Sequence, residues 1–295
     1  MISVCIPIFN IDVRNLVSGL LNQLTDQMEI ILIDDCSHET FKLKNRTLED
    51  ERITYIELEE NIGRSKIRNL FLDYTKNDYL LFLDCDSLLV SSDFLNNYLN
   101  SLQGKPKVVC GGRLYPAECP SEYQILRWKY GVLRESKDAK TRTMESNRSF
   151  MTNNFLIEKT VLMNNQFDER LSKYGHEDTL LGIELSKKAI DIVHIENPVL
   201  NNDVEVGVLF IQKTEQAIDN LLLIEEFYPE KNRLIDYITL LSTAVKIKKL
   251  GMKGLLRVCY TIFGAKTKNY LITSKNPSIT LFNIYKLMYY FNKMK

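Results

Sequence analysis

Two carboxylates stand one residue apart directly after a short apolar run. Asp84 and Asp86 follow the run at residues 79–83 and are separated only by a cysteine. Carboxylates at this spacing can converge on one hard cation, and Mg²⁺ or Mn²⁺ prefers oxygen ligands that substrate phosphates usually complete. The pair therefore predicts a divalent-metal site beside a phosphate-bearing substrate, although an exposed acidic turn has the same pattern.

A second acidic pair, Asp34 and Asp35, closes the apolar run at residues 29–33. Acidic residues at strand ends accept hydrogen bonds from a nucleobase or a ribose hydroxyl in nucleotide-binding folds. Aspartate also favours turns and helix starts for purely local reasons. The pair is consistent with nucleotide binding and does not establish it.

A third cluster, Gly175-His176-Glu177-Asp178, leads into a segment with helical spacing. A carboxylate at a helix start lies near the positive end of the helix dipole, which favours its ionised form. An ionised carboxylate that reaches an acceptor hydroxyl is a competent general base. Helix capping explains the same residues, and we interpret His176 as a hydrogen-bonding loop residue rather than a metal ligand.

The elements that must position these clusters alternate along the first 86 residues. Apolar strand-like runs lie at 3–9, 29–33, 53–56 and 79–83, and helical spacing lies at 13–24 and 61–75. Such alternation predicts a largely parallel sheet with helices on both faces. Ligands of these sheets bind beyond the carboxyl ends of the strands, where both acidic pairs are expected.

The rest of the chain is less regular. We expect strands at 107–114 and 191–195, helices at 122–134 and 178–188, and a charged mobile loop at 135–148. After Asp203, helical patterns at 210–227 and 233–250 precede a basic, aromatic tail. The 295 residues suffice for one large α/β domain with an appendage, or for two modest domains.

Charge is distributed unevenly. The chain has 38 basic and 38 acidic residues, but residues 237–295 hold eleven Lys or Arg and no Asp or Glu. The overall balance gives no indication of nucleic-acid binding. The basic tail, in particular residues 246–295, predicts contact with an anionic surface such as a membrane face. A solvated helical face or a partner-binding surface has the same composition.

The cysteines and the N-terminus predict a cytoplasmic protein. The six cysteines contain no C-x-x-C pair and stand mostly in apolar runs, as buried thiols of a reducing compartment do. The N-terminus lacks the pattern of a signal peptide, and no apolar run reaches the length needed to cross a bilayer.

Taken together, the motifs resemble the GT-A glycosyltransferases of family 2 in order and spacing. The segments that carry the resemblance are SVCIPIFN at 3–10, EIILIDDCS at 29–37, N-x-GR-x-x-x-RN at 61–69, LDCD at 83–86, FDER at 167–170 and GHED at 175–178. The resemblance extends over about residues 1–203. It implies a GT-A fold, a Rossmann-like α/β domain with a mainly parallel sheet flanked by helices, and a C-terminal helical extension. We expect a GT-A domain at 1–205, with a nucleotide-sugar half at 1–112 and an acceptor half at 113–205, and a basic helical region at 206–295.

For the donor, the resemblance implies contacts with nucleobase, ribose and metal. Pro7 and Phe9 resemble positions that pack on the nucleobase, and Asp35 resembles the residue that hydrogen-bonds it. Asp84 resembles the ribose-facing and Asp86 the metal-binding member of the D-x-D motif, with Mn²⁺ or Mg²⁺ as the metal. The uridine diphosphate carrier is likewise implied by the resemblance.

For the reaction, the resemblance implies a single displacement with inversion. Arg68 looks like the donor-side arginine of the family, with Asn61 and Gly63 shaping its loop. Asp178 looks like the catalytic base, and Glu177 looks like the residue that holds the acceptor hydroxyl. The expected function is transfer of a sugar from a nucleoside diphosphate to a glycan or lipid-linked acceptor in cell-surface polysaccharide synthesis.

One departure concerns the metal. After residues 197–200, similar proteins often place a histidine that completes the metal site, whereas this chain has Asn201-Asn202-Asp203. Asn201 or Asp203 could supply an oxygen ligand there, or water could replace it.

Further acceptor-side candidates are Asn153 and Asn154 near the sugar, Trp128 as a stacking platform, and His176. Core or scaffold roles explain the asparagines and the tryptophan better than a ligand contact does, because such residues are frequent in cores and loops.

Two other readings remain open. A sugar-1-phosphate nucleotidylyltransferase needs a glycine-rich, basic loop after the first strand, which residues 10–14 do not form. A degenerate sugar-nucleotide binding or assembly protein is supported only by Asn201. The intact Asp84, Asp86 and Asp178 argue against it.

Overall fold

The computed structural model describes residues 1–171 and 173–294 and divides into two compact units. The first comprises Met1–Tyr115, Glu135–Ser172 and Glu177–Asp203, and the second comprises Pro116–Arg134, Lys173–His176 and Val204–Lys295. This division differs from the expected boundary at residue 205, because two segments of the expected acceptor half group with the C-terminal helices.

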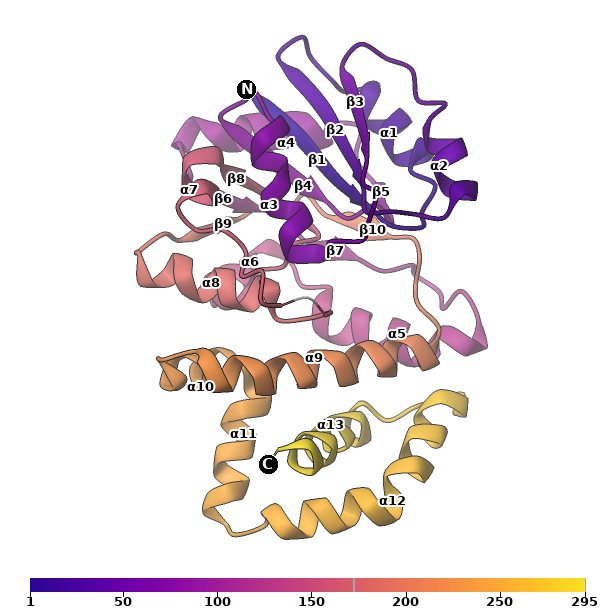
Figure 1. Cartoon of the computed structure of the whole chain (residues 1–295), viewed down its shortest axis with the longest axis vertical. Helices are drawn as coiled ribbons and strands as arrows, with labels where there is room; N and C mark the ends of the chain where they lie inside the picture. Colours follow the sequence, from indigo (N-terminus) through magenta and orange to yellow (C-terminus); the bar gives the residue numbers. More distant parts are fainter. Residues whose placement is uncertain (172, 295) are drawn as a thin grey trace. The chain divides into compact units, whose positions relative to one another are not determined.

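The first unit is built on a seven-stranded sheet of order β3-β2-β1-β4-β8-β6-β9 (Figure 1). Its strands are β1 (Ile2–Ile8), β2 (Met28–Asp34), β3 (Ile53–Glu57), β4 (Tyr79–Leu83), β6 (Val108–Cys110), β8 (Asn154–Glu158) and β9 (Ile192–His194). All pairings are parallel except those of β8, which runs antiparallel to β4 and β6. The predicted mainly parallel sheet is confirmed, and it contains one reversed strand, β8, that was not predicted from the sequence.

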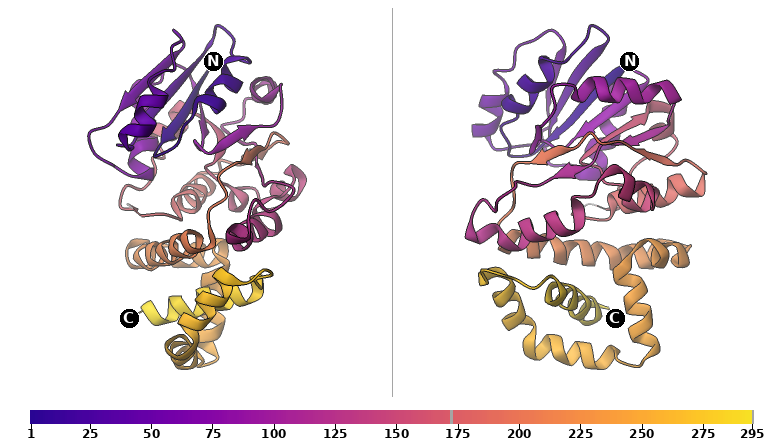
Figure 2. Two further views of the ribbon diagram at one scale, coloured as in Figure 1. Left: turned by 90° about the vertical axis from the view of Figure 1, so that its right-hand side faces the viewer. Right: turned by 180° about the vertical axis from the view of Figure 1, so that it is seen from behind.

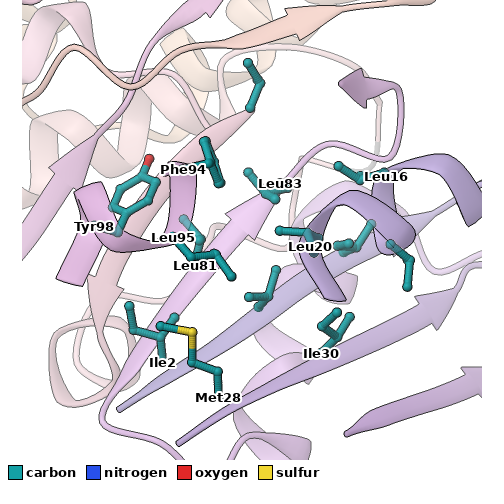
Figure 3. Packing of buried hydrophobic residues seen from close by; sticks show 14 of the residues in the cluster. Ile2, Leu16, Leu20, Met28, Ile30, Leu81, Leu83, Phe94, Leu95 and Tyr98 are labelled. Atoms are coloured by element: carbon teal, nitrogen blue, oxygen red, sulfur yellow. The ribbon is translucent and has the colours of Figure 1, made fainter. Parts of the chain in front are cut away.

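Alternating side chains bury both faces of this sheet, as expected where helices cover a parallel sheet. The helices are α1 (Arg14–Leu21), α2 (Glu39–Asn45), α3 (Arg64–Tyr74), α4 (Phe94–Ser101), α6 (Ala139–Thr143), α7 (Lys159–Met163) and α8 (Glu177–Lys187). Figure 3 shows Leu20 of α1 and Phe94 of α4 on one face, over Leu81 and Leu83 of β4. The opposite face holds a second apolar cluster that includes Phe71 of α3.

A small second sheet, β5-β10-β7, completes the first unit. It consists of β5 (Ser87–Leu89), β10 (Val199–Asn201) and β7 (Arg113–Leu114). Strand β5 directly follows Asp86, β10 ends at Asn201 and β7 begins at Arg113. The small sheet therefore brings residues distant in sequence to the carboxyl end of β4.

The charged segment 135–148 is not the solvated loop that its composition predicts. It contains α6, and Arg142 of this helix is only 1% exposed. The Arg142 guanidinium donates to the carbonyl oxygens of Cys110, Gly111 and Ile195 at 3.0, 3.1 and 2.8 Å. Because a guanidinium has five N–H donors, one side chain can satisfy several carbonyls at the ends of β6 and β9.

The second unit is helical. Its elements are α5 (Ile125–Tyr130), α9 (Gly207–Phe227), α10 (Lys231–Tyr237), α11 (Thr239–Lys249), α12 (Lys253–Thr273) and α13 (Ile279–Lys293), and both views of Figure 2 show α12 beside α13. The single helix expected at 233–250 is interrupted at Ile238, which has extended backbone angles. Phe210, Leu271 and Phe282 form part of the core of this unit.

Two sequence expectations concern the chain as a whole. Within the described residues, no helix combines the length and the apolar character that crossing a membrane requires. All six cysteines are free thiols, and Cys5 and Cys110 are buried. The other four are partly exposed, so burial holds for only two of the six thiols.

Asn154 links β8 to its surroundings and generates a stability prediction. Its amide donates to the carbonyls of Gly112 and Asn197 at 3.0 and 2.9 Å, and its oxygen accepts from Tyr98 Oη at 2.6 Å. Asn154→Ala removes three buried hydrogen bonds, so we expect the free energy of unfolding to fall by about 2–4 kcal/mol. Urea unfolding tests this, with exposed Asn164→Ala as the control. Equal stability of the two variants would contradict the prediction.

Candidate active site

The candidate site of the first unit lies at the carboxyl ends of β2 and β4. Asp35 follows β2, and Asp84 and Asp86 follow β4. Asn153 precedes β8 and reaches the same edge because β8 is antiparallel to β4. The Asp84 N–H donates to the Asn153 carbonyl at 3.0 Å, which fixes the two segments to each other.

Three guanidinium groups surround the Asp84 carboxylate. Arg68 Nη2 donates to Oδ1 at 3.1 Å, and Arg113 Nη2 and Arg64 Nη2 lie 3.4 and 3.8 Å from Oδ2. Burial alone raises the pKa of the Asp84 carboxyl, but the three positive charges outweigh it and hold that pKa below its usual value. Asp84 is therefore ionised, and Glu177 and Glu135 contact the same three arginines.

Asp86 has the opposite environment. Burial, followed by the negative charge of Asp84, raises the pKa of the Asp86 carboxyl to about 6. Asn201 Nδ2 donates to Asp86 Oδ2 at 3.4 Å. The pairing of β10 with β5, which sets Asn201 opposite Ser87, produces this contact.

Asp86 and Asn201 fit a hard cation. Asn201 is 5% exposed, and its Oδ1 has no hydrogen-bond partner among the described residues. A buried carboxylate beside an unpaired amide oxygen offers the oxygen ligands that Mg²⁺ or Mn²⁺ prefers. Within the described part of the chain no group of three or more His, Cys, Asp or Glu forms a cage, so substrate oxygens would have to complete the site. Asp203, the other expected ligand, is exposed.

Asp35 fixes the loop before α3. Its carboxylate accepts from the N–H groups of Ile62 and Gly63 at 2.7 and 3.1 Å, and Asn61 Nδ2 donates to the Asp35 carbonyl at 3.1 Å. Gly63 has φ of 82°, a conformation that glycine adopts at little cost. Burial raises the pKa of Asp35 despite these hydrogen bonds. Asp35, Asn61 and Gly63 therefore form one local structure that starts α3 with Arg64 and Arg68 in its first turns.

Pro7 and Phe9 lie at the end of β1. Phe9, directly after β1, is 50% exposed, whereas most apolar residues of β1 are buried. An exposed aromatic ring at this edge is available for stacking, as the nucleobase role requires. Pro7 is partly exposed at the same strand end.

Glu177 and Asp178 begin α8, near the same arginines. Glu177 Oε1 lies 3.0 Å from Arg64 Nε and 3.8 Å from Arg68 Nη1, so these arginines join Glu177 to Asp84. Asp178 accepts from the Thr179 N–H at 2.6 Å. Burial, followed by the charge of Glu177, raises the pKa of the Asp178 carboxyl to about 6.

The two candidate asparagines differ. Asn154 is fully buried with its amide engaged in the core, which accounts for it as a structural residue. Asn153 is 4% exposed, and neither its Oδ1 nor its Nδ2 has a hydrogen-bond partner in the described structure. Because buried polar groups are nearly always paired, Asn153 is the one of the two that can serve a ligand.

The remaining candidates belong to the second unit. Trp128 donates its indole N–H to the Pro116 carbonyl at 2.8 Å. His176 has φ of 71° and follows Gly175, where φ is 101° and an added Cβ would lie 2.5 Å from the Ala217 side chain. Gly175 and His176 therefore form a constrained turn before α8.

Sequence reasoning missed Arg113 and did not assign Arg64. Arg113 is partly buried, and Glu135 lies 3.5 Å from its Nη1 while the ring of Tyr115 lies beside its guanidinium. The sequence signal that could have identified Arg113 is its place in Gly111-Gly112-Arg113, which directly follows an apolar run. The sequence pattern at 64–68 did not distinguish a functional Arg64 from an arginine on a solvated helix surface.

The raised pKa of Asp178 predicts how its replacement affects stability. The native state holds a proton on Asp178 up to about pH 6, whereas the unfolded chain releases it near pH 4, so this contribution to stability is lost as pH rises between those values. Asp178→Asn should therefore raise the free energy of unfolding by about 1–2 kcal/mol at pH 8 and change it little at pH 4.

Urea unfolding at both pH values measures this effect. Asp168→Asn is the control of opposite sign, because hydrogen bonding to Arg170 lowers the pKa of Asp168. If the Asp178→Asn variant were less stable than the wild type at pH 8, that result would contradict the buried environment of the Asp178 carboxyl in the structure.

Comparisons with known proteins identify the family of the chain. A family model described as glycosyl transferase family 2 matches residues 3–167. An uncharacterized glycosyltransferase of Haemophilus influenzae is 29% identical over 121 residues, which are 40% of this chain and 40% of that protein. The putative teichuronic acid biosynthesis glycosyltransferase TuaG of Bacillus subtilis is 34% identical over 90 residues, which are 29% of this chain and 36% of that protein. The chain thus spans two fifths or less of the length of these relatives.

Solved structures share the fold. The mannosyltransferase PcManGT from Pyrobaculum calidifontis, in complex with GDP-Man and Mn²⁺, is 14% identical, with a TM-score of 0.66 over 98% of this chain and 85% of that chain. S. aureus TarS 1–349 in complex with UDP is 15% identical, with a TM-score of 0.52 over 98% of this chain and 89% of that chain. The expected α/β fold of the GT-A type with a C-terminal helical region is confirmed. Since the family model matches more than half of its residues, the chain belongs to glycosyl transferase family 2.

Proposed function

We propose that the protein is an inverting glycosyltransferase that moves a sugar from a nucleoside diphosphate donor to a hydroxyl of a glycan or lipid-linked acceptor. The observation that carries the proposal is the arginine-lined Asp84 at the carboxyl end of β4, joined through Arg64 and Arg68 to Glu177 beside Asp178. One cluster thus connects groups suited to a diphosphate with a candidate base.

The guanidinium groups suit the donor diphosphate. Arginine binds phosphate oxygens in bidentate fashion, and Arg64, Arg68 and Arg113 converge on one carboxylate from two different elements. Phe9 offers a ring to the base and Asn153 offers an unpaired amide at the same edge. Uridine diphosphate is the proposed carrier. TarS in complex with UDP supports this choice, whereas PcManGT binds GDP-Man.

Asp86 and Asn201 are the proposed ligands of Mn²⁺ or Mg²⁺. The unpaired Asn201 Oδ1 and the raised pKa of Asp86 support this assignment, as does the Mn²⁺ in the PcManGT complex. When bound, the metal supplies Lewis-acid stabilisation of the charge that develops on the diphosphate leaving group. Arg68 and Arg113 supply fixed positive charge for the same developing charge.

Asp178 is the proposed general base. A carboxyl with a pKa of about 6 is ionised at neutral pH and is more basic than an ordinary aspartate, which suits proton abstraction. Asp178 takes the proton from the acceptor hydroxyl as its oxygen attacks the anomeric carbon, and the bond to the diphosphate breaks. A single attack from the side opposite the leaving group inverts the anomeric configuration. Glu177, besides the proposed contact with the acceptor hydroxyl, orients Arg64.

The proposed acceptor is a growing cell-surface polysaccharide or its lipid-linked precursor. The match to a putative teichuronic acid biosynthesis enzyme supports this class of product. We place the protein in the cytoplasm at the inner face of the membrane, with the basic region 246–295 toward anionic lipid. Six free cysteines and a tail without acidic residues support this location.

Donor turnover tests the proposed function. Purified protein with Mn²⁺ or Mg²⁺ is given a panel of nucleotide sugars, and release of nucleoside diphosphate is followed. We expect slow hydrolysis of one donor, with a rate that rises with pH through about 6 as Asp178 ionises. Asp178→Asn should lower turnover by about 10²-fold or more while donor binding persists. Asp86→Ala should abolish metal-dependent donor binding.

Asp191→Asn, an exposed aspartate of the same unit, is the matched control and should retain wild-type turnover. Donor binding without turnover under every condition would favour the binding or assembly protein. Absence of donor binding with either metal would contradict the metal assignment to Asp86 and Asn201.

A further inference from the structure

Helix α12 presents an apolar stripe to solvent. Leu255, Val258, Ile262 and Phe263 are 55, 54, 57 and 52% exposed. Residues three or four positions apart lie on one side of a helix, so these four side chains form a continuous surface, here called the α12 face. In an ordinary surface helix this stripe would be turned toward the core.

The packing of α12 in its own unit does not use this face. Gly264 and Leu271 are its buried residues, and the ring of Tyr260 lies 5.8 Å from that of Tyr289 in α13. Arg257 Nε donates to the Phe291 carbonyl of α13 at 2.8 Å. The opposite side of α12 therefore packs on α13. The α12 face does not take part in that packing.

Exposed apolar and basic residues continue beside the face. Leu250 is 72% and Met252 is 40% exposed in the turn that joins α11 to α12. Lys248 and Lys249 are exposed in the last turn of α11, and Lys266 is exposed on α12 itself. No acidic residue occurs between positions 237 and 295.

We propose that the α12 face binds the surface of an anionic phospholipid membrane, with α12 lying in the plane of the interface. An exposed apolar stripe rimmed by lysines is the composition that inserts among lipid headgroups, because acyl chains accept the apolar side chains and anionic headgroups attract the lysines. A second copy of the chain fits less well, since docking two such faces would bring lysines together without acidic partners. This inference deepens the proposed function. The membrane contact is argued from the α12 face alone, and only its link to a lipid-linked acceptor rests on the proposed function.

Vesicle sedimentation of the full chain at low salt tests this surface. We expect binding to vesicles of phosphatidylglycerol with phosphatidylcholine, and much weaker binding to phosphatidylcholine alone. Replacing Ile262 and Phe263 together by Ser should reduce binding at least about tenfold, because two inserted side chains are lost. Both are more than half exposed, so the melting temperature should hardly change. Leu43→Ser, which alters a 58% exposed leucine of α2, is the control and should bind as wild type.

Three outcomes would overturn the inference. They are failure of the wild type to bind anionic vesicles, equal binding by the Ile262/Phe263 double variant, and a dimer in solution that the double variant abolishes without any vesicle binding. Donor hydrolysis by the same preparations separates this inference from the proposed function. Vesicle binding by a protein that turns over no donor supports the membrane surface and contradicts the transferase, and turnover without vesicle binding does the reverse.

Discussion

The buried carboxylate of Asp84, held among three guanidinium groups, is the interaction on which the candidate site depends. Burying a charge costs several kcal/mol unless partners compensate it, and removing one partner from such a group is strongly destabilising. Arg68 and Arg113 provide the nearest compensation at 3.1 and 3.4 Å. Glu177 and Glu135 contact the same arginines, so three guanidinium groups and three carboxylates form one connected cluster.

The arginines reach Asp84 only because two backbone features are fixed elsewhere. Asp35, at the end of β2, holds the loop that begins α3, and Arg64 and Arg68 project from the first turns of that helix. Arg113 comes from β7, whose pairing with β10 also brings Asn201 beside Asp86. The large sheet therefore positions one side of the site and the small sheet the other.

Much of this arrangement could be predicted from local patterns. Alternation of apolar runs with helical spacing predicts parallel strands whose carboxyl ends share an edge, and Asp35, Asp84 and Asp86 are found there. The reversal of β8 could not be predicted, because the direction of a strand depends on its connections and not on its composition. The expectation of a mobile loop at 135–148 failed for a related reason, since a charged segment reveals nothing about the distant backbone carbonyls that its side chains will satisfy, as Arg142 does.

The pairing of Asn201 with Asp86 is the most informative point of comparison between sequence and structure. The sequence identifies the departure from histidine but leaves Asn201 and Asp203 as alternatives. The register of β10 against β5 favours Asn201, because it buries Asn201 beside Asp86, whereas Asp203 is exposed. An amide oxygen in place of an imidazole keeps an oxygen-only environment, which hard cations such as Mg²⁺ and Mn²⁺ accept.

A crystal structure of the protein with UDP and Mn²⁺ tests the central claim most directly, because anomalous scattering locates the manganese independently of the nucleotide. The account predicts an anomalous peak beside Asp86 and Asn201, with the diphosphate in hydrogen-bonding contact with at least one of Arg64, Arg68 and Arg113. A nucleotide bound away from these arginines, or manganese bound without Asp86, would contradict it.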